Sequence, residues 1–319
     1  MRVAALHRYG DRLVLEDWPD PEPVGDQVVI DVRAAGMCHT DLHLMHWRNR
    51  PLPLVMGHEI AGDADGIGPV LVHQSWGCRH CAICLRGEEQ LCPEVTEAGF
   101  ERPGGYAEKV LVPSSRYLIP LDGLSPERAA PLTDAGSTAY RAVRRAAPFL
   151  PSGGRAVLIG AGALGQFGVQ FLRLLTDAEV VVVDVSDAKL DRALQLGAHH
   201  AMRAEQVSGP VDAVLDFVCE ADTMALAARV VRPGAVIVRI GSGEGWLRFG
   251  RGVLPPEVTL ASARGGSLAD VTEVLAHARR GELQWEIETI GLDQVNEGLE
   301  RLRRGEVTGR LVITPGRPS

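Results

Sequence analysis

The part of the sequence that most constrains the fold begins near residue 150, where short apolar runs alternate with segments of helical periodicity. The runs are continuously apolar, so they predict strands that are buried on both faces. Helices between such strands cover both faces of a parallel sheet, which gives a doubly wound α/β domain. The predicted strands are Ala156–Ile159, Glu179–Asp184, Ala213–Phe217 and Ala235–Ile240, and the predicted helices are Gln166–Leu175, Ala188–Leu196 and Met224–Val231.

A glycine-rich turn, GAGALG at residues 160–165, follows the first predicted strand and opens the first predicted helix. In this position the first glycine permits a tight turn and the second lets the backbone approach a pyrophosphate. The third allows close contact between helix and strand, and the helix N-terminus supplies N–H donors. We therefore expect a Rossmann domain in which Gly160, Gly162, Leu164 and Gly165 bind a dinucleotide.

The residue that ends the next predicted strand, Asp184, indicates which dinucleotide binds. A carboxylate at this place accepts hydrogen bonds from the adenosine ribose and repels a 2′-phosphate. The four residues that follow, Val185–Ala188, contain no cation that could hold such a phosphate. These residues favour NAD over NADP.

The cysteines are unevenly placed, because four of the six fall within a short segment. Their spacing, C-x2-C-x2-C-x7-C, brings together four soft ligands, and four thiolates fill a tetrahedral site completely. This pattern is typical of a structural zinc. Free thiols, a pair of disulfides or an iron–sulfur cluster are the alternatives, but nothing else in the chain indicates electron transfer. The four residues are Cys78, Cys81, Cys84 and Cys92.

Length, composition and charge set broader limits. A chain of 319 residues is long enough for two domains, and 45% hydrophobic residues suffice for a packed core. A formal net charge of −8 argues against a nucleic-acid or anionic-membrane partner. The sequence has no apolar run of membrane-spanning length and no secretory signal at its N-terminus, so we expect a cytoplasmic protein.

Six motifs, in this order along the chain, resemble those of medium-chain zinc-dependent alcohol dehydrogenases. They are CHTDLH from residue 38, GHEIAG from residue 57, the cysteine segment, GGYAEKVLVP from residue 104, PLTDAGSTAYRAV from residue 131 and GAGALG. The resemblance implies a GroES-like, β-rich catalytic domain formed by residues 1–136 and 266–319, with the structural-zinc lobe at about 77–93. The Rossmann NAD-binding domain then spans residues 137–265. Strands are predicted at Gln27–Val32, Glu108–Val112 and Arg310–Thr314, and helices at Leu268–Arg280 and Leu292–Arg304.

The same resemblance implies a second, catalytic zinc. Cys38 and His58 match its first two ligands, and Asp134 stands where many members have a cysteine. An aspartate at this position resembles the secondary-alcohol branch of the family. By resemblance, Asp41 orients the ligating histidine, and the catalytic residues are Thr40, which binds the substrate oxygen, His43, which ends a proton relay, and Glu59, a carboxylate that approaches the zinc.

Three further positions match cofactor contacts in the family. Lys189 corresponds to a lysine that contacts the ribose, Thr138 to a threonine against the nicotinamide, and Arg310 to an arginine that reaches the pyrophosphate. The resemblance thus implies reversible hydride transfer between a secondary alcohol and NAD by a homodimer or homotetramer. A polyol or sugar dehydrogenase of the same superfamily is the alternative, followed by a non-catalytic NAD-binding paralogue.

One departure from the family pattern lies at residues 62–77. This segment is shorter than in most members and lacks their Gly-Asp-x-Val turn. It normally completes a strand near the substrate, so we expect an altered outer wall of the substrate cleft.

Overall fold

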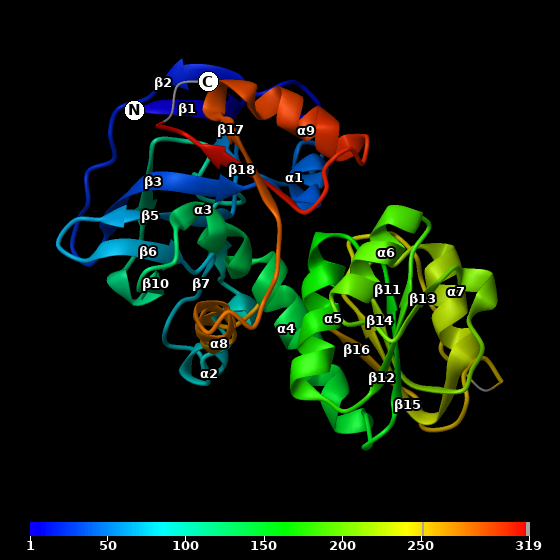
Figure 1. Ribbon diagram of the computed structural model, residues 1–319. Helices are drawn as coiled ribbons and strands as arrows, with labels where there is room; N and C mark the ends of the chain where they lie inside the picture. The colour runs from blue at the N-terminus through cyan, green and yellow to red at the C-terminus, as the bar shows by residue number, and fades with distance from the viewer. Residues whose placement is uncertain (251, 317–319) are drawn as a thin grey trace. The chain divides into compact units, whose positions relative to one another are not determined.

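The computed structural model describes residues 1–250 and 252–316, and the last three residues of the predicted C-terminal segment lie outside this range. The chain forms two compact units (Figure 1). Unit 1 combines Met1–Asp134 with Gly266–Ser319, and unit 2 is Ala135–Gly265. The predicted domain boundary after residue 136 therefore lies two residues beyond the one in the structure.

Unit 2 is built on a six-stranded sheet in which all neighbouring strands are parallel. The sheet order is β13-β12-β11-β14-β15-β16, in which β11 is first along the chain and the strand order reverses beside it. This is the doubly wound Rossmann order. Its strands are β11 (Arg155–Ile159), β12 (Glu179–Val183), β13 (His200–Met202), β14 (Val211–Asp216), β15 (Val231–Arg239) and β16 (Thr259–Ser262).

Helices lie on both faces of this sheet (Figure 1). Helices α4 and α5 pack against each other, and α7 packs against β14 and β15. Among the described residues, no helix combines the length and apolar character needed to cross a membrane. The helices of unit 2 are α4 (Ala135–Ala146), α5 (Ala163–Leu175), α6 (Asp187–Gln195) and α7 (Ala221–Val230), with 3-10 turns η4 (Ala147–Phe149) and η5 (Ala204–Gln206).

The central strands of unit 2 are apolar on both faces because helices cover both. Val157 pairs with Val181 on one side and Val214 on the other, and all three are fully buried. The four predicted strands are present, but the prediction missed β13 and β16. Both are short edge strands, and β16 has an exposed pattern rather than an apolar run. The third predicted helix ends at Val230, and Val231 already begins β15, which is longer than predicted.

Unit 1 is mainly β-structure. Its largest sheet has the order β10-β6-β5-β3-β18-β17, with β9 also paired to β3, and smaller sheets have the orders β2-β1-β4 and β7-β8. The strands are β1 (Arg2–Leu6), β2 (Val14–Asp17), β3 (Val28–Gly36), β4 (Leu54–Val55), β5 (Glu59–Ala64), β6 (Gly68–Val72), β7 (Ser75–Trp76), β8 (Thr96–Glu97), β9 (Lys109–Val112), β10 (Leu118–Pro120), β17 (Ile287–Gly291) and β18 (Arg310–Thr314). The helices and 3-10 turns are α1 (His39–Leu44), α2 (Ala82–Leu85), η1 (Glu89–Leu91), η2 (Ser115–Tyr117), α3 (Pro126–Ala129), η3 (Ala130–Thr133), α8 (Leu268–Arg279), η6 (Leu292–Gln294) and α9 (Val295–Arg303).

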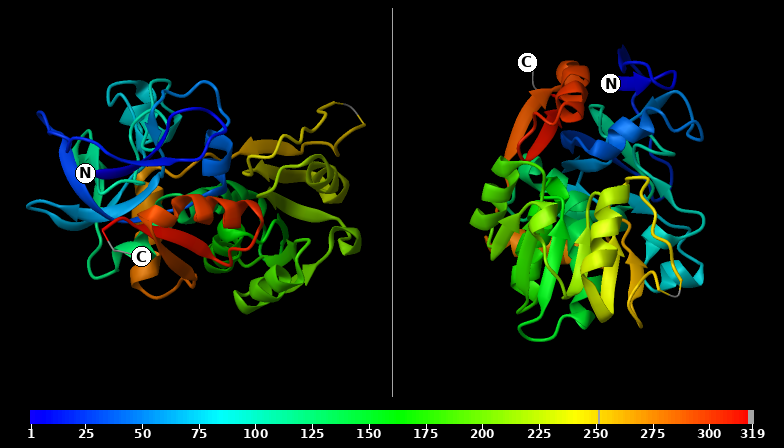
Figure 2. Two further views of the ribbon diagram at one scale, coloured as in Figure 1. Left: turned by 90° about the horizontal axis from the view of Figure 1, so that it is seen from above. Right: turned by 90° about the vertical axis from the view of Figure 1, so that its right-hand side faces the viewer.

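The C-terminal strand β18 completes the sheet of unit 1. It pairs antiparallel with the end of β3, with Ile313 opposite Ala35, and parallel with β17 (Figure 2, where β18 is red). Leu311 and Ile313 of this strand are fully buried in the core of the unit. This pairing explains why the residues after 266 belong with the N-terminal part of the chain.

Residues 59–72, which include most of the shortened segment, form a tight hairpin. Strands β5 and β6 pair from Ile60 opposite Val72 to Ala64 opposite Gly68. Gly66 and Gly68 have φ of +70° and +95°, the left-handed region in which glycine carries no steric penalty. Because β6 pairs with β10, the sheet is continuous although this segment is shorter than in most family members. The effect of the deletion on the substrate cleft stays a prediction.

Candidate active site and metal centres

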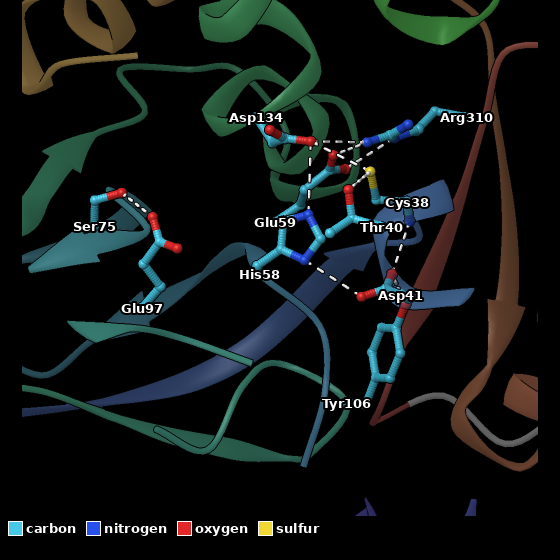
Figure 3. A network of polar contacts seen from close by, with 10 residues as sticks. All are labelled: Cys38, Thr40, Asp41, His58, Glu59, Ser75, Glu97, Tyr106, Asp134 and Arg310. Carbon is cyan, nitrogen blue, oxygen red and sulfur yellow. Dashed lines mark hydrogen bonds and ion pairs between the residues drawn. The ribbon is translucent and has the colours of Figure 1, made fainter. Parts of the chain in front are cut away.

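Three residues predicted to bind a catalytic metal converge in unit 1. Cys38 follows β3, His58 precedes β5, and Asp134 follows η3 (Figure 3). Antiparallel pairing places Gly36 opposite Glu59, which brings the ends of β3 and β5 together, and η3 packs against both strands. Cys38 Sγ lies 3.4 Å from Asp134 Oδ2, and His58 Nε2 lies 3.6 Å from the same oxygen.

The spacing of these atoms fits a zinc ion. Bond lengths of about 2.3 Å to sulfur and 2.0–2.2 Å to nitrogen or oxygen give tetrahedral edges of roughly 3.4–3.6 Å. The observed 3.4 and 3.6 Å agree with these edges. A thiolate, an imidazole and a carboxylate also form a common zinc donor set. Cys38 and His58 are buried, whereas the Asp134 side chain keeps 14% of its surface exposed.

Asp41 lies beside the histidine of this site, and its predicted role in orienting the ring stays a prediction. Its Oδ1 lies 3.3 Å from His58 Nδ1, and its Oδ2 accepts the backbone N–H of Cys38 at 2.8 Å. Burial alone would lower the pKa of His58, but the charge of Asp41 and the bonds to Asp134 and Asp41 raise it well above its ordinary value. The neighbouring carboxylates of Asp41 and Asp134 therefore favour positive charge at this ring.

Glu59 belongs to the same group of possible metal ligands, and it forms a buried ion pair with Arg310. Arg310 Nε donates to Glu59 Oε2 at 2.9 Å, its Nη2 contacts Oε1, and Nη2 also lies 3.5 Å from Asp134 Oδ2. A side chain at Gly36 would collide with Glu59, because an ideal Cβ there lies 1.9 Å from Glu59 Oε2. The predicted role of Glu59 near the metal is compatible with this place. The predicted pyrophosphate contact of Arg310 stays a prediction.

Thr40 and His43 lie on the short helix α1 that follows Cys38. The Thr40 hydroxyl is 3.5 Å from Cys38 Sγ and is half-buried. His43 is one helical turn further on and exposed, and its ring stacks on Trp47 at 6.5 Å between centroids. Residues three apart share a helix face, so Thr40 and His43 lie on the same side of α1.

The four cysteines of the second predicted site also converge. Sγ atoms of Cys78 and Cys84 are 3.9 Å apart, as are those of Cys81 and Cys92. A tetrahedral site with zinc–sulfur bonds of about 2.3 Å has edges of roughly 3.8 Å. Backbone N–H groups point at these sulfurs, and such bonds lower the pKa of Cys81 to about 7. An ideal Cβ at Gly77 would lie 2.6 Å from Cys84 Sγ, so this position requires glycine.

In unit 2, the glycine turn between β11 and α5 has the geometry that its sequence predicts. Gly160 has φ of +93°. An ideal Cβ at Gly165 would lie 1.9 Å from the carbonyl oxygen of Gly160. An ideal Cβ at Gly162 would have no neighbouring atom within 4 Å. The first and third glycines thus serve the turn and its packing, while the second leaves open space. Leu164 lies in the first turn of α5. These features fit a pyrophosphate at the N-terminus of α5.

Asp184 lies just after β12, where its Oδ2 accepts the backbone N–H of Ala161 at 2.8 Å. This bond ties the predicted ribose-binding carboxylate to the glycine turn. Lys189 is half-buried on α6, and Thr138 is buried on α4. Their predicted cofactor contacts stay predictions.

One cation near Asp184 was not predicted from the sequence. Arg203 follows β13, and its Nη1 lies 3.5 Å from the Asp184 backbone oxygen while its Nη2 contacts Asp187 Oδ1 at 2.5 Å. Arg203 is distant in sequence from Val185–Ala188, but parallel pairing of β12 with β13 brings it to the same sheet edge. The general rule that parallel strands end together could have identified it.

Two protein-family models match the chain, one mainly within unit 1 and one mainly within unit 2. Residues 25–123 match the family model described as alcohol dehydrogenase GroES-like domain, and residues 163–280 match the one described as zinc-binding dehydrogenase. These matches confirm the predicted fold class, a GroES-like β-rich domain with a Rossmann domain.

Individual relatives match over nearly the whole chain. A NAD-dependent alcohol dehydrogenase of Sulfurisphaera tokodaii is 33% identical over 99% of this chain and 100% of its own. A D-arabinose 1-dehydrogenase (NADP(+)) of Saccharolobus solfataricus is 31% identical over 98% of this chain and 97% of its own. The crystal structure of the alcohol dehydrogenase from Aeropyrum pernix gives a TM-score of 0.91 at 32% identity, covering 99% of this chain and 100% of that one.

Proposed function

Since this chain belongs to the family of medium-chain zinc-dependent alcohol dehydrogenases, we propose that it transfers hydride reversibly between a secondary alcohol and NAD at the Cys38–His58–Asp134 site. The observation that carries the site assignment is the convergence of these three side chains with metal-ligand spacing. Bound zinc would supply a Lewis acid that polarises the substrate oxygen, and bound NAD the hydride acceptor.

The residues of α1 handle the proton of the alcohol. Thr40 is positioned beside Cys38 to accept a hydrogen bond from the substrate hydroxyl. His43, the expected end of the proton relay, is exposed and can exchange a proton with solvent. Asp41 holds the His58 ring in one orientation, and Arg310 neutralises Glu59 so that the site does not accumulate excess negative charge.

We propose two zinc ions per subunit with different roles. The four cysteines would leave no open coordination position. Cys38, His58 and Asp134 would leave one for substrate, because the fourth possible ligand of that group, Glu59, is paired with Arg310. A cluster of four cysteines that binds metal rather than forming disulfides is typical of a reducing compartment, and we propose a cytoplasmic location. The proposal predicts two zinc ions by metal analysis of the active protein, and a single zinc in fully active protein would contradict it.

A second copy of the chain is the partner that we propose for the edge of the unit 2 sheet. Strand β16 ends the sheet order, and Leu260 on it is 42% exposed. A hollow of about 420 Å³ lies beside this strand, with Trp246 and Leu247 in its lining, and Phe249 nearby in sequence is also exposed. Unpaired strand edges with apolar side chains favour pairing between chains. We expect a homodimer or homotetramer, and a monomeric mass by light scattering would contradict this.

A polyol or sugar is the second candidate substrate class, because the D-arabinose dehydrogenase is a relative over nearly the full chain. An NAD-dependent activity screen over primary, secondary and polyhydroxy alcohols, together with zinc quantification, separates the candidates. Highest kcat/KM on simple secondary alcohols supports the proposal, and highest kcat/KM on polyols favours the second candidate. Binding of NADH without turnover on any alcohol would instead indicate a non-catalytic paralogue.

A further inference from the structure

A buried tyrosine hydroxyl contacts the carboxylate behind the proposed catalytic metal site. Tyr106 is fully buried, and its hydroxyl donates to Asp41 Oδ2 at 2.6 Å (Figure 3). The same oxygen accepts the Cys38 backbone N–H, while Asp41 Oδ1 faces His58 Nδ1 at 3.3 Å. An unbroken series of polar contacts therefore runs from Tyr106 through Asp41 to the metal ligand His58.

The backbone around Tyr106 holds this hydroxyl in place. The Tyr106 N–H donates to the Met56 carbonyl at 2.9 Å, and its own carbonyl accepts the N–H of Ala4 at 2.8 Å. Gly57 makes room for the ring, because an ideal Cβ there would lie 2.5 Å from Tyr106 Cδ1. Burial, together with the charge of Asp41, holds the pKa of Tyr106 well above its ordinary value. The phenol is thus a fixed, protonated donor.

We propose that Tyr106 is a positioning residue for the catalytic metal, acting through Asp41 and His58, an inference that rests on the proposed function of the Cys38 site. Two donors on Asp41 Oδ2 prevent rotation of the carboxylate and keep Oδ1 aimed at His58 Nδ1. A carboxylate oxygen 3.3 Å from Nδ1 favours the tautomer with the proton on Nδ1, which leaves the Nε2 lone pair free to bind metal. The ring alone would fill the same space, so the hydroxyl is the part of Tyr106 that performs this role.

The variant Tyr106→Phe tests the proposal because it removes only the hydroxyl. Loss of an outer partner of a metal ligand typically weakens metal binding by about 10–100-fold, and we expect the lower end for a group one step further out. The measurement is the dissociation constant of Zn²⁺ by competition with a chelator. The matched control is Tyr117→Phe, since Tyr117 is also buried but its hydroxyl lies 3.4 Å from the Gly77 carbonyl, away from Asp41. The control should leave the zinc affinity of the Cys38 site unchanged.

Two additional variants make the result unambiguous. Cys38→Ser identifies which of the two zinc-release steps belongs to the catalytic site, because that step should disappear. If both steps remain in Cys38→Ser, the proposed function is contradicted and the role of Tyr106 is not the cause. In an Asp41→Asn background, Tyr106→Phe should change zinc affinity by less than about twofold, because coupled residues are non-additive.

A spectroscopic readout distinguishes positioning from packing. With Co²⁺ at the Cys38 site, Tyr106→Phe should shift the absorption bands of the metal, whereas a residue that only packs would lower the melting temperature without moving them. Wild-type zinc affinity and wild-type bands in Tyr106→Phe would overturn the proposal, as would a full additive loss in the Asp41→Asn background.

Discussion

Replacing Arg310 with glutamine should destabilise unit 1 far more than the same change at the surface. The Arg310 guanidinium makes two contacts with Glu59 and lies 3.5 Å from Asp134. The Arg310 and Glu59 side chains are only 5% and 0% exposed. Removing one partner of a buried ion pair leaves an uncompensated charge and costs about 3–5 kcal/mol. We expect a loss of this size for Arg310→Gln.

The chain offers a matched control in Arg301→Gln. Arg301 also makes two contacts with a glutamate, at 2.7 Å each to Glu288, and belongs to the same unit. Its side chain and that of Glu288 are 27% and 48% exposed, and exposed pairs contribute about 0–1 kcal/mol. The two substitutions therefore differ in the burial of the pair rather than in its chemistry.

Thermal unfolding measures the difference. At about 2–4 °C for each kcal/mol, Arg310→Gln should lower the melting temperature of unit 1 by roughly 6–20 °C, and Arg301→Gln by at most about 4 °C. Adding Glu59→Gln to Arg310→Gln should recover part of the loss because no buried charge is then left unpaired. Equal shifts for the two arginine variants would refute the reasoning. If Arg310 also binds the cofactor pyrophosphate, NADH affinity should stay reduced in the double variant.

Three further predictions concern the metal sites and the cofactor. Asp134→Ala should lose the catalytic zinc and reduce hydride transfer by orders of magnitude, whereas Asp134→Cys should retain zinc and measurable activity; full zinc loading and activity in Asp134→Ala would refute the ligand assignment. The wild type should prefer NAD to NADP at least tenfold in kcat/KM, which corresponds to about 1.4 kcal/mol. Asp184→Gly should raise the relative use of NADP, because Arg203 then supplies a cation for the 2′-phosphate. Adding Arg203→Gln to Asp184→Gly should remove this gain. Cys81→Ser should lower thermal stability, because a structural zinc contributes folding free energy, whereas Cys38→Ser should abolish turnover and leave the melting temperature nearly unchanged.

Features that are formed by one short segment of the chain could be predicted from the sequence of that segment. The glycine turn lies between one strand and one helix, and its three glycines have the conformations and contacts that their order predicts. The four-cysteine lobe is likewise formed by residues 78–92, and its sulfurs meet without help from distant strands. Continuous apolar runs identified the four inner strands of unit 2, because burial on both faces leaves no polar alternation.

The missed features depend on residues that are distant in sequence. Short edge strands carry weak apolar patterns, so β13 and β16 could not be distinguished from loops. Arg203 reaches Asp184 only through the pairing of β12 with β13. Tyr106 lies within the motif GGYAEKVLVP, but its bond to Asp41 spans 65 residues and has no local signal. The motif identified the family without identifying this contact.

The charges around the catalytic site constrain how Glu59 can act. Cys38 as thiolate and Asp134 would together balance a divalent ion, so a third anion bound directly to the metal is electrostatically unnecessary. Both oxygens of Glu59 are engaged by Arg310, and the pair is buried, which makes the separation of its charges costly. Glu59 already lies in the same group of possible metal ligands as Cys38, His58 and Asp134, so Arg310 competes with a bound metal for the charge of its carboxylate. Because the same guanidinium also reaches Asp134, any movement of Arg310 toward a cofactor phosphate would change the charge balance at the metal ligand as well as at Glu59.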